Sequence, residues 1–445
     1  MGLGSILDRR LKSVGAPWMC LAIFLVVFLA YFCSRNVTST DSAWTIYTAM
    51  SIIREGDTDL DEYQGMMSAG DYRIENISGH LYDFFPVGTP ILAVPFVYAV
   101  DYASAKLLSF NLDFFMSKAF PNGVQLLSAS FLSALCAVII YLTARMRLDV
   151  KYSLLVTFVF AFCTPAWSTA SRALWSNGPS MLMLAAALYL ILLAERRPWV
   201  IMPVGSILAF SYVVRPTNSV SILLLGLWVL LEHRRHFAGF VLCGMVVAVP
   251  FFAYNFSVYH SPLAPYFMPE RIGWHGQNIE ALAANLVSPS RGLFVFSPVL
   301  LFSAFGVFLK ARGRKLDRLD YFLVAIIVLH WIVISSYRRW WLGWSFGPRG
   351  FTDVLPYFVY FLIFAVDYMR SSAGRGSVFF ACVFSALILF SFFVHYEGAN
   401  SRDAFWGWSE SPVNVDDDVS RVWDWRDPQF LRGVVFLVAE SITRF

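Results

Sequence analysis

Apolar runs close to the length of a bilayer crossing recur along this chain of 445 residues, and they constrain its fold more than any other feature. A helix needs about 20 apolar residues to cross the hydrocarbon layer of a membrane. With 58% hydrophobic and only 14% charged residues, the chain lies far from the composition of a soluble domain. The sequence therefore predicts an all-α polytopic membrane protein.

We expect about eleven transmembrane helices, because that number of runs reaches or approaches the required length. They form a transmembrane domain over residues 1–395, and residues 396–445 follow as an outer C-terminal segment with interfacial elements. The runs cover residues 17–34, 122–144, 152–168, 177–194, 200–214, 218–232, 237–257, 294–309, 319–336, 351–368 and 377–395.

Basic residues collect in the connections at alternate ends of these runs. Membrane proteins keep such connections in the cytoplasm, so the amino terminus is expected to be cytoplasmic and the acidic connections to lie outside. The predicted inner connections carry Arg145, Arg147 and Lys151, then Arg196 and Arg197, Arg234 and Arg235, Lys310 through Arg318, and Arg370 with Arg375.

The first outer loop, residues 35–121, is the longest of three outer segments, and we expect interfacial helices in it. Residues 43–54 can form a short amphipathic helix. Residues 88–108 are apolar enough to cross the membrane, but two prolines and the internal Asp101 favour an interfacial or re-entrant element. If this stretch crosses instead, every later helix inverts. The other outer segments are residues 257–293 and 395–445.

Charge and cysteine usage narrow the classes of partner. The net charge of +4 is small, and the basic residues form no face that could follow a nucleic acid. All six cysteines lie in apolar spans without the short spacing of metal ligands. The acidic run at residues 54–62 offers oxygen ligands for a divalent ion, but its spacing is not that of an EF-hand loop. We favour a solvated turn, no metal site and no cofactor, with a divalent ion as the alternative.

Asp41 follows the first apolar run by about seven residues, at the water boundary of the membrane. Polar residues surround it and a predicted surface helix follows, so Asp41 is a candidate cap for that helix. The same carboxylate is a candidate general base, because it could take the proton from an acceptor hydroxyl that attacks a sugar. The local sequence leaves both roles open.

Three arginines, Arg172, Arg215 and Arg349, stand at predicted outer helix ends. A guanidinium facing lipid is costly, so each is expected to snorkel to the surface or to face a polar cavity. Guanidinium groups match phosphate oxygens with two parallel hydrogen bonds. Together the three arginines favour an anionic ligand such as a lipid-linked phosphate, and we assign them to binding the donor phosphate.

The densest aromatic stretch covers residues 337–349, where Gly343, Gly347 and Pro348 predict a tight turn. Such a turn presents Trp344 and Arg349 at one place. Tryptophan is also common at membrane interfaces, so anchoring is the competing interpretation. The candidate residues for binding a sugar or an acceptor are Trp344, His80, Arg291 and His275, although a lone histidine is more often a surface residue.

These residues resemble those of the GT-C superfamily of integral-membrane glycosyltransferases, which includes the protein O-mannosyltransferases and the bacterial aminoarabinose transferases. Four features carry the resemblance, and they occur in order along nearly the whole chain. They are Asp41 after the first helix, the segments 52–61 and 85–90, and the turn at 343–349.

The resemblance implies a GT-C-like helix bundle that takes a sugar from a polyprenyl-phosphate donor on the extracytoplasmic side. Transfer would be inverting, with Asp41 as the base and a glycan, lipid or protein as the acceptor. By the same analogy the location is a bacterial or archaeal cytoplasmic membrane. Two departures argue against a two-carboxylate metal site: Ser42 follows Asp41 in place of a second acid, and the connection 167–177 contains no carboxylate.

Two other classes of protein compete with the enzyme. A flippase or transporter of a lipid-linked sugar needs the same arginines and aromatic residues, but it would more naturally carry charges in mid-helix and paired broken helices. A non-catalytic binding subunit is the third reading. The enzyme requires Asp41 to share a pocket with guanidinium groups that come from distant helices.

Overall fold

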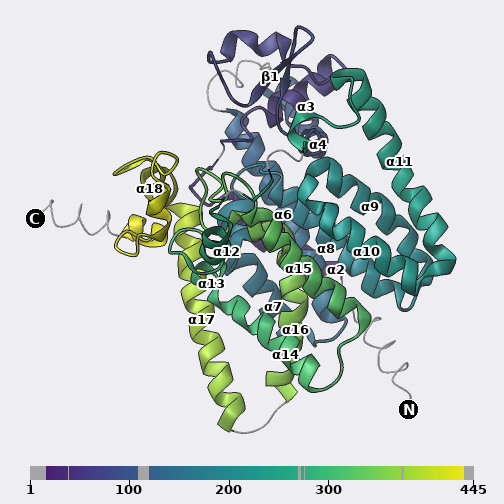
Figure 1. The fold of residues 1–445 in the computed structure, drawn as a ribbon, viewed down its shortest axis with the longest axis vertical. Helices are drawn as coiled ribbons and strands as arrows, with labels where there is room; N and C mark the ends of the chain where they lie inside the picture. Colours follow the sequence, from purple (N-terminus) through teal and green to yellow (C-terminus); the bar gives the residue numbers. More distant parts are fainter. Residues whose placement is uncertain are drawn as a thin grey trace, which may run out of the picture.

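The computed structural model describes residues 17–38, 40–108, 120–268, 272–274, 276–371 and 375–434. Within these ranges the chain is a bundle of α-helices with one small sheet, an antiparallel hairpin of β1 (Ile74–Ile77) and β2 (His80–Asp83). The bundle occupies most of the molecule, and the hairpin stands at one end of it (Figure 1). The prediction of an all-α membrane architecture is thus confirmed in its coarse form.

Each of the eleven apolar runs contains a helix. Six of these helices are long and apolar enough to cross a membrane, namely α6, α8, α11, α15, α17 and α16 with the turn before it. Four more are apolar but shorter, and α14 has 12 residues, so eleven crossings remain a prediction. The helices are α2 (Pro17–Phe32), α6 (Phe120–Arg145), α7 (Val150–Phe162), α8 (Asn177–Ala194), α9 (Ile201–Val214), α10 (Ser219–Glu232), α11 (Arg234–Tyr259), α14 (Leu301–Arg312), α15 (Arg318–Ser335), α16 (Leu355–Ser371) and α17 (Arg375–Asn400).

The helices differ in how much of their surface other helices cover. In the apolar windows, 89% of the residues of α16 with its preceding turn, 67% of those of α8 and 61% of those of α6 are buried, against 22% in α17 and 11% in α11. A helix that is apolar all round and only slightly covered needs a lipid-like surrounding. Therefore α6, α8 and α16 form the centre of the bundle, and α11 and α17 form its outer edge.

The segment predicted to be the first outer loop folds against one end of the bundle, which we call the loop end (Figure 1). It contains α3 (Thr45–Arg54), the hairpin and α4 (Gly88–Ala103). A Cβ at Gly88 would lie 2.6 Å from the backbone nitrogen of Val214, the last residue of α9. At its other end α4 carries Asp101, which pairs with Arg54 at 3.3 Å. Both ends of α4 thus lie against elements of the loop end, in agreement with an interfacial element.

The two later segments that the sequence predicts to be outer also fold at the loop end. The second contains α12 (Asn278–Val287) and α13 (Leu293–Phe296), and the C-terminal segment contains α18 (Trp408–Glu410) among short turns. In Figure 1, α18 lies beside the upper end of α17. The indole nitrogen of Trp406 donates to the carbonyl of Val37 at 3.1 Å, so the C-terminal segment packs directly on the chain that leaves α2.

The two sets of connections separate to opposite ends of the bundle. Arg147 and Arg370 both pair with Asp367 at the carboxyl end of α16, and Arg318 pairs with Glu232 at the end of α10. These residues belong to the basic connections, so we call this the basic end. Because α8 and α16 run from the loop end to the basic end, each with 17 or 18 residues, the two ends are about 26 Å apart.

Close backbone contact between α9 and α11 generates a first prediction. A Cβ at Gly205 would collide with the carbonyl oxygen of Phe240, whereas a Cβ at Gly226 of α10 has its nearest neighbour at 4.0 Å. We expect Gly205→Ala to destabilise the protein by about 1–3 kcal/mol through overpacking. Gly226→Ala should be neutral or slightly stabilising, because alanine is the better helix former. Thermal melting in detergent measures both, and equal melting temperatures would contradict the close contact.

Candidate functional site

A cavity of about 990 Å³ opens at the loop end of the bundle. Its walls come from the residues after α2, the hairpin region, the connections before α8 and after α9, the loop between α15 and α16, and the C-terminal segment. Five arginines and two aspartates are among the lining residues, beside several aromatic side chains. The cavity therefore joins segments of the chain that lie up to 376 positions apart, from Thr40 to Asp416.

Asp41 lies in the wall of this cavity with both carboxylate oxygens engaged. Its Oδ2 is 3.2 Å from Nη1 of Arg349, and its Oδ1 accepts a hydrogen bond of 3.0 Å from the hydroxyl of Tyr72. The residue before α3 is Trp44, and no side chain caps that helix. The capping role for Asp41 is thus wrong, because the helix begins at Thr45, three residues later than a cap at Asp41 requires.

Arg349 joins the first outer loop to the loop before α16. Its guanidinium carbon lies 4.0 Å above the ring of Trp175, and Nη2 donates to the carbonyl of Leu342 at 3.0 Å. The side chain is almost fully buried, yet it lines the cavity. A guanidinium held against an aromatic face and a carboxylate in this way has its orientation fixed before any ligand binds.

The predicted turn around Gly343 and Gly347 is present. Both glycines have positive φ, +60° and +59°, a backbone conformation that residues with a side chain rarely adopt. At Gly347 a Cβ would also lie 2.6 Å from the ring of Phe296. The turn places Trp344 in the cavity wall, where its indole nitrogen donates to Asn414 Oδ1 at 3.0 Å. Trp344 and Arg349 thus line one cavity, as the sequence predicted.

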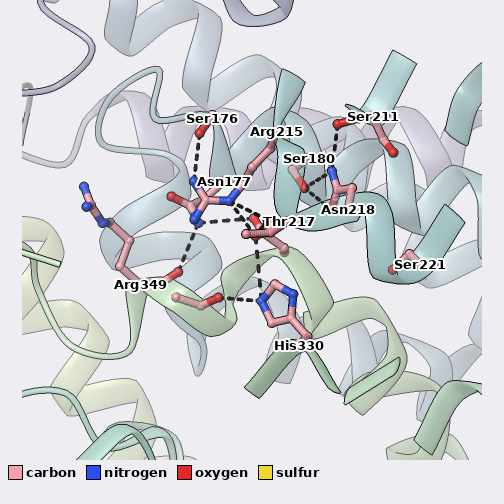
Figure 2. Close-up of polar contacts among 12 residues, drawn as sticks. Ser176, Asn177, Ser180, Ser211, Arg215, Thr217, Asn218, Ser221, His330 and Arg349 are labelled. Atoms are coloured by element: carbon pink, nitrogen blue, oxygen red, sulfur yellow. Dashed lines mark hydrogen bonds and ion pairs between the residues drawn. The ribbon is translucent and has the colours of Figure 1, made fainter. Parts of the chain in front are cut away.

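Arg215 also lines the cavity, at its most buried side, which we call the floor. It is held there by a buried carboxylate, Asp353, that sequence analysis missed. Its Nε lies 2.7 Å from Oδ2 of Asp353, and its Nη1 donates to the hydroxyl of Ser176 at 2.9 Å. The amide of Asn177 donates to Asp353 Oδ1 and to the carbonyl of Arg349, at 3.2 Å each. Figure 2 shows this network linking Arg215, Asn177 and Arg349. The acidic residue near the start of the apolar run 351–368 was the signal that could have revealed it.

The structure does not bring Arg172 to the cavity, so its assignment to the donor phosphate is corrected. Arg172 is fully buried, and its guanidinium donates to the carbonyls of Ser34 and Tyr31 and to the hydroxyl of Ser171. Arg172 is not among the residues that line the cavity. Its donors are used by the main chain that leaves α2, so Arg172 holds that segment, and with it Asp41, in position.

Arg291 is corrected in the same way. It is fully buried and donates to the carbonyls of Ser290, Trp341 and Gly343, and to Oε1 of Gln429. Two of these carbonyls belong to the turn that carries Trp344. Arg291 therefore shapes the cavity wall from behind and does not contact a ligand within it.

His80 stands outside the cavity on the exposed hairpin. Its Nδ1 is 2.7 Å from Oδ2 of Asp61 and 4.0 Å from Asp59, and the hydrogen bond that His80 donates to Asp61 raises the pKa of His80. Ligand atoms of these three residues lie within 4.8 Å of one another, a set that could hold a metal ion. His80 is thus not part of the sugar or acceptor site in the cavity. His275 lies outside the described residues.

Comparison of the chain with models of protein families, with curated proteins and with solved structures finds no match in any of the three. The chemistry of the cavity therefore has to be argued from its own residues.

Asp83, at the end of β2, is a buried carboxyl next to the cavity wall. Its Oδ1 accepts a hydrogen bond from the backbone nitrogen of Phe85 at 3.0 Å, and its Oδ2 has no hydrogen-bond partner among the described residues. Burial raises the pKa of Asp83 from 3.8 to about 8. Asp83 is thus protonated at neutral pH in the folded protein.

This raised pKa predicts a pH dependence of stability. Between about pH 4 and pH 8 the folded protein holds a proton on Asp83 that the unfolded chain releases, so stability falls as the pH rises through this window. Asp83→Asn removes that proton uptake and should flatten the curve of melting temperature against pH. Asp424→Asn, at an exposed carboxylate of the same end, should leave the slope unchanged. An unaltered slope in Asp83→Asn would contradict the raised pKa.

Proposed function

We propose that this protein is a membrane glycosyltransferase that moves a sugar from a polyprenyl-phosphate donor to an acceptor hydroxyl, with inversion. The observation that carries the proposal is the ion pair of 3.2 Å between Asp41 and Arg349 in the wall of one large cavity. A carboxylate beside guanidinium groups unites the two chemical functions that such a transfer needs: acceptance of a proton and stabilisation of a departing phosphate.

Asp41 is the proposed general base. Each of its oxygens accepts one hydrogen bond, from Arg349 and from Tyr72, and a carboxylate oxygen has a second lone-pair site for a further donor. The side chain is about a quarter exposed, so an acceptor hydroxyl can approach it from the cavity. The hydrogen bond from Tyr72 keeps the carboxylate oriented while the proton is transferred.

Arg349 and Arg215 are the proposed ligands of the donor phosphate. Both are at least nine-tenths buried and both line the cavity. Their positive charge offsets the charge that develops on the phosphate as the bond to the sugar breaks. Lipid phosphate is already a good leaving group, so charge stabilisation and positioning supply the catalysis without a nucleotide. Trp344, which is partly exposed, offers a face for the sugar ring.

A carrier of lipid-linked sugars is the second candidate function, and one observation favours it. A further cavity of about 590 Å³ lies at the basic end, lined by Lys310, Arg147 and Arg196 among others. Cavities at both ends of α8 and α16 are what alternating access through this bundle requires. Against this reading, 89% of the apolar window that includes α16 is buried, so tightly packed helix separates the two cavities.

The role of Asp41 is tested by Asp41→Asn. Wild-type protein is purified, its bound lipid is identified by mass analysis, and transfer of the sugar from that lipid is then measured. We expect Asp41→Asn to retain the lipid but to lose transfer by about 10²–10⁴-fold, the usual contribution of a general base. Arg349→Gln should instead retain less lipid, because it removes charge from the phosphate site.

Asp424→Asn serves as the matched control, since it makes the same chemical change at an exposed site of the loop end. Melting temperatures establish that each variant is folded. Undiminished transfer by folded Asp41→Asn would show that Asp41 is not the base. Retention of lipid with no transfer even in the wild type, together with movement of the lipid across vesicle membranes, would favour the carrier.

A further inference from the structure

The five arginines of the cavity differ in burial. Arg215 and Arg349 are 8% exposed and form the floor. Arg338 and Arg339, on the loop between α15 and α16, are exposed and line the mouth. Arg73 is intermediate in exposure. Cationic side chains are thus present at two depths of the same cavity.

The floor arginines and Arg73 each have a carboxylate partner. Arg215 pairs with Asp353, Arg349 with Asp41, and Arg73 with Asp71 at 2.7 Å. Arg338 and Arg339 differ, because neither forms an ion pair or a hydrogen bond in the part of the chain that the structure describes. Two adjacent cations without a counter-ion repel one another, and an anionic ligand would relieve that repulsion.

The acidic residue near the mouth, Asp416, already accepts a hydrogen bond from another side chain. Asp416 lines the same cavity, but its Oδ1 accepts a hydrogen bond of 2.7 Å from the indole nitrogen of Trp341. The loop that carries the arginine pair is held at both sides. Tyr337 forms a backbone bridge with Ile272, and Leu342 accepts the hydrogen bond from Arg349. The pair is therefore presented by an anchored loop.

We propose that Arg338 and Arg339 form a second anion subsite at the mouth of the cavity, and that the acceptor carries a phosphate or carboxylate group that binds there. The lipid of the donor has to remain with the membrane, whereas the acceptor enters through the mouth. Paired guanidinium groups bind phosphate and carboxylate oxygens in preference to neutral hydroxyls. That the acceptor is the ligand of this subsite rests on the proposed function. The existence of the subsite rests only on the presence of cationic side chains at both the floor and the mouth of the cavity.

The subsite predicts that ligands with two anionic groups bind better than ligands with one. The probes are methylphosphonate and a series of alkane bisphosphonates with about two to eight methylene groups, titrated calorimetrically into the full-length protein in neutral detergent. A ligand that reaches both subsites gains from the high effective concentration of its second group. We expect at least one length to bind about tenfold or more tightly than methylphosphonate.

The double variant Arg338→Gln/Arg339→Gln should abolish this gain, so that no bisphosphonate binds to it more tightly than methylphosphonate does. The matched control is Arg402→Gln/Arg426→Gln, which removes the same charge from exposed positions of the loop end outside the cavity, and it should keep the gain. The inference is overturned if no length binds more tightly than methylphosphonate, if the double variant keeps the gain, or if the control loses it. The two proposals can be rejected independently. The titration tests only the second anion subsite, and the transfer activity of Asp41→Asn tests only the proposed reaction.

Discussion

Asp353 is a carboxylate with no exposed surface at the loop end of α16, and the arrangement of the cavity floor depends on how its charge is compensated. An uncompensated buried charge costs several kcal/mol. Compensation comes from Arg215, with a further hydrogen bond from Asn177, while His330 lies 3.8 Å away. These residues stand on or next to α8, α9 and α15, so one charge fixes the relative positions of four helix ends.

The shape of the cavity wall depends on a similar compensation, in which buried backbone carbonyls receive hydrogen bonds from buried arginines. Arg172 and Arg291 are buried and have no carboxylate partner among the described residues, and carbonyl groups of irregular segments supply their acceptors. Backbone carbonyls outside helices need donors when they are buried. Each arginine therefore stabilises a segment that could not be buried alone: the chain after α2 that presents Asp41, and the turn that presents Trp344.

The features that the sequence predicted correctly depend on local composition. Apolar length predicts the helices, alternating basic connections predict the two ends of the bundle, and the glycines at 343 and 347 predict the turn. The pairing of charges is not local: Arg215 and Asp353 are 138 positions apart. The sequence shows that a buried arginine is costly without showing its partner, which is why Arg172 and Arg291 were assigned to a ligand and Asp353 was overlooked. The cavity floor was therefore only half predictable.

Under the proposed function, the ion pair between Asp41 and Arg349 favours binding of the donor before proton transfer from the acceptor. With the cavity free of substrate, Arg349 donates to the carboxylate that should act as the base, and this hydrogen bond occupies one of its two oxygens. A donor phosphate would compete for the same guanidinium, because it offers oxygens of the same geometry and greater charge. Arrival of the donor would thereby release one oxygen of Asp41 while Tyr72 keeps the other in place. One oxygen of Asp41 would then be free to accept a proton only when the sugar to be transferred is already bound, which limits unproductive proton transfer.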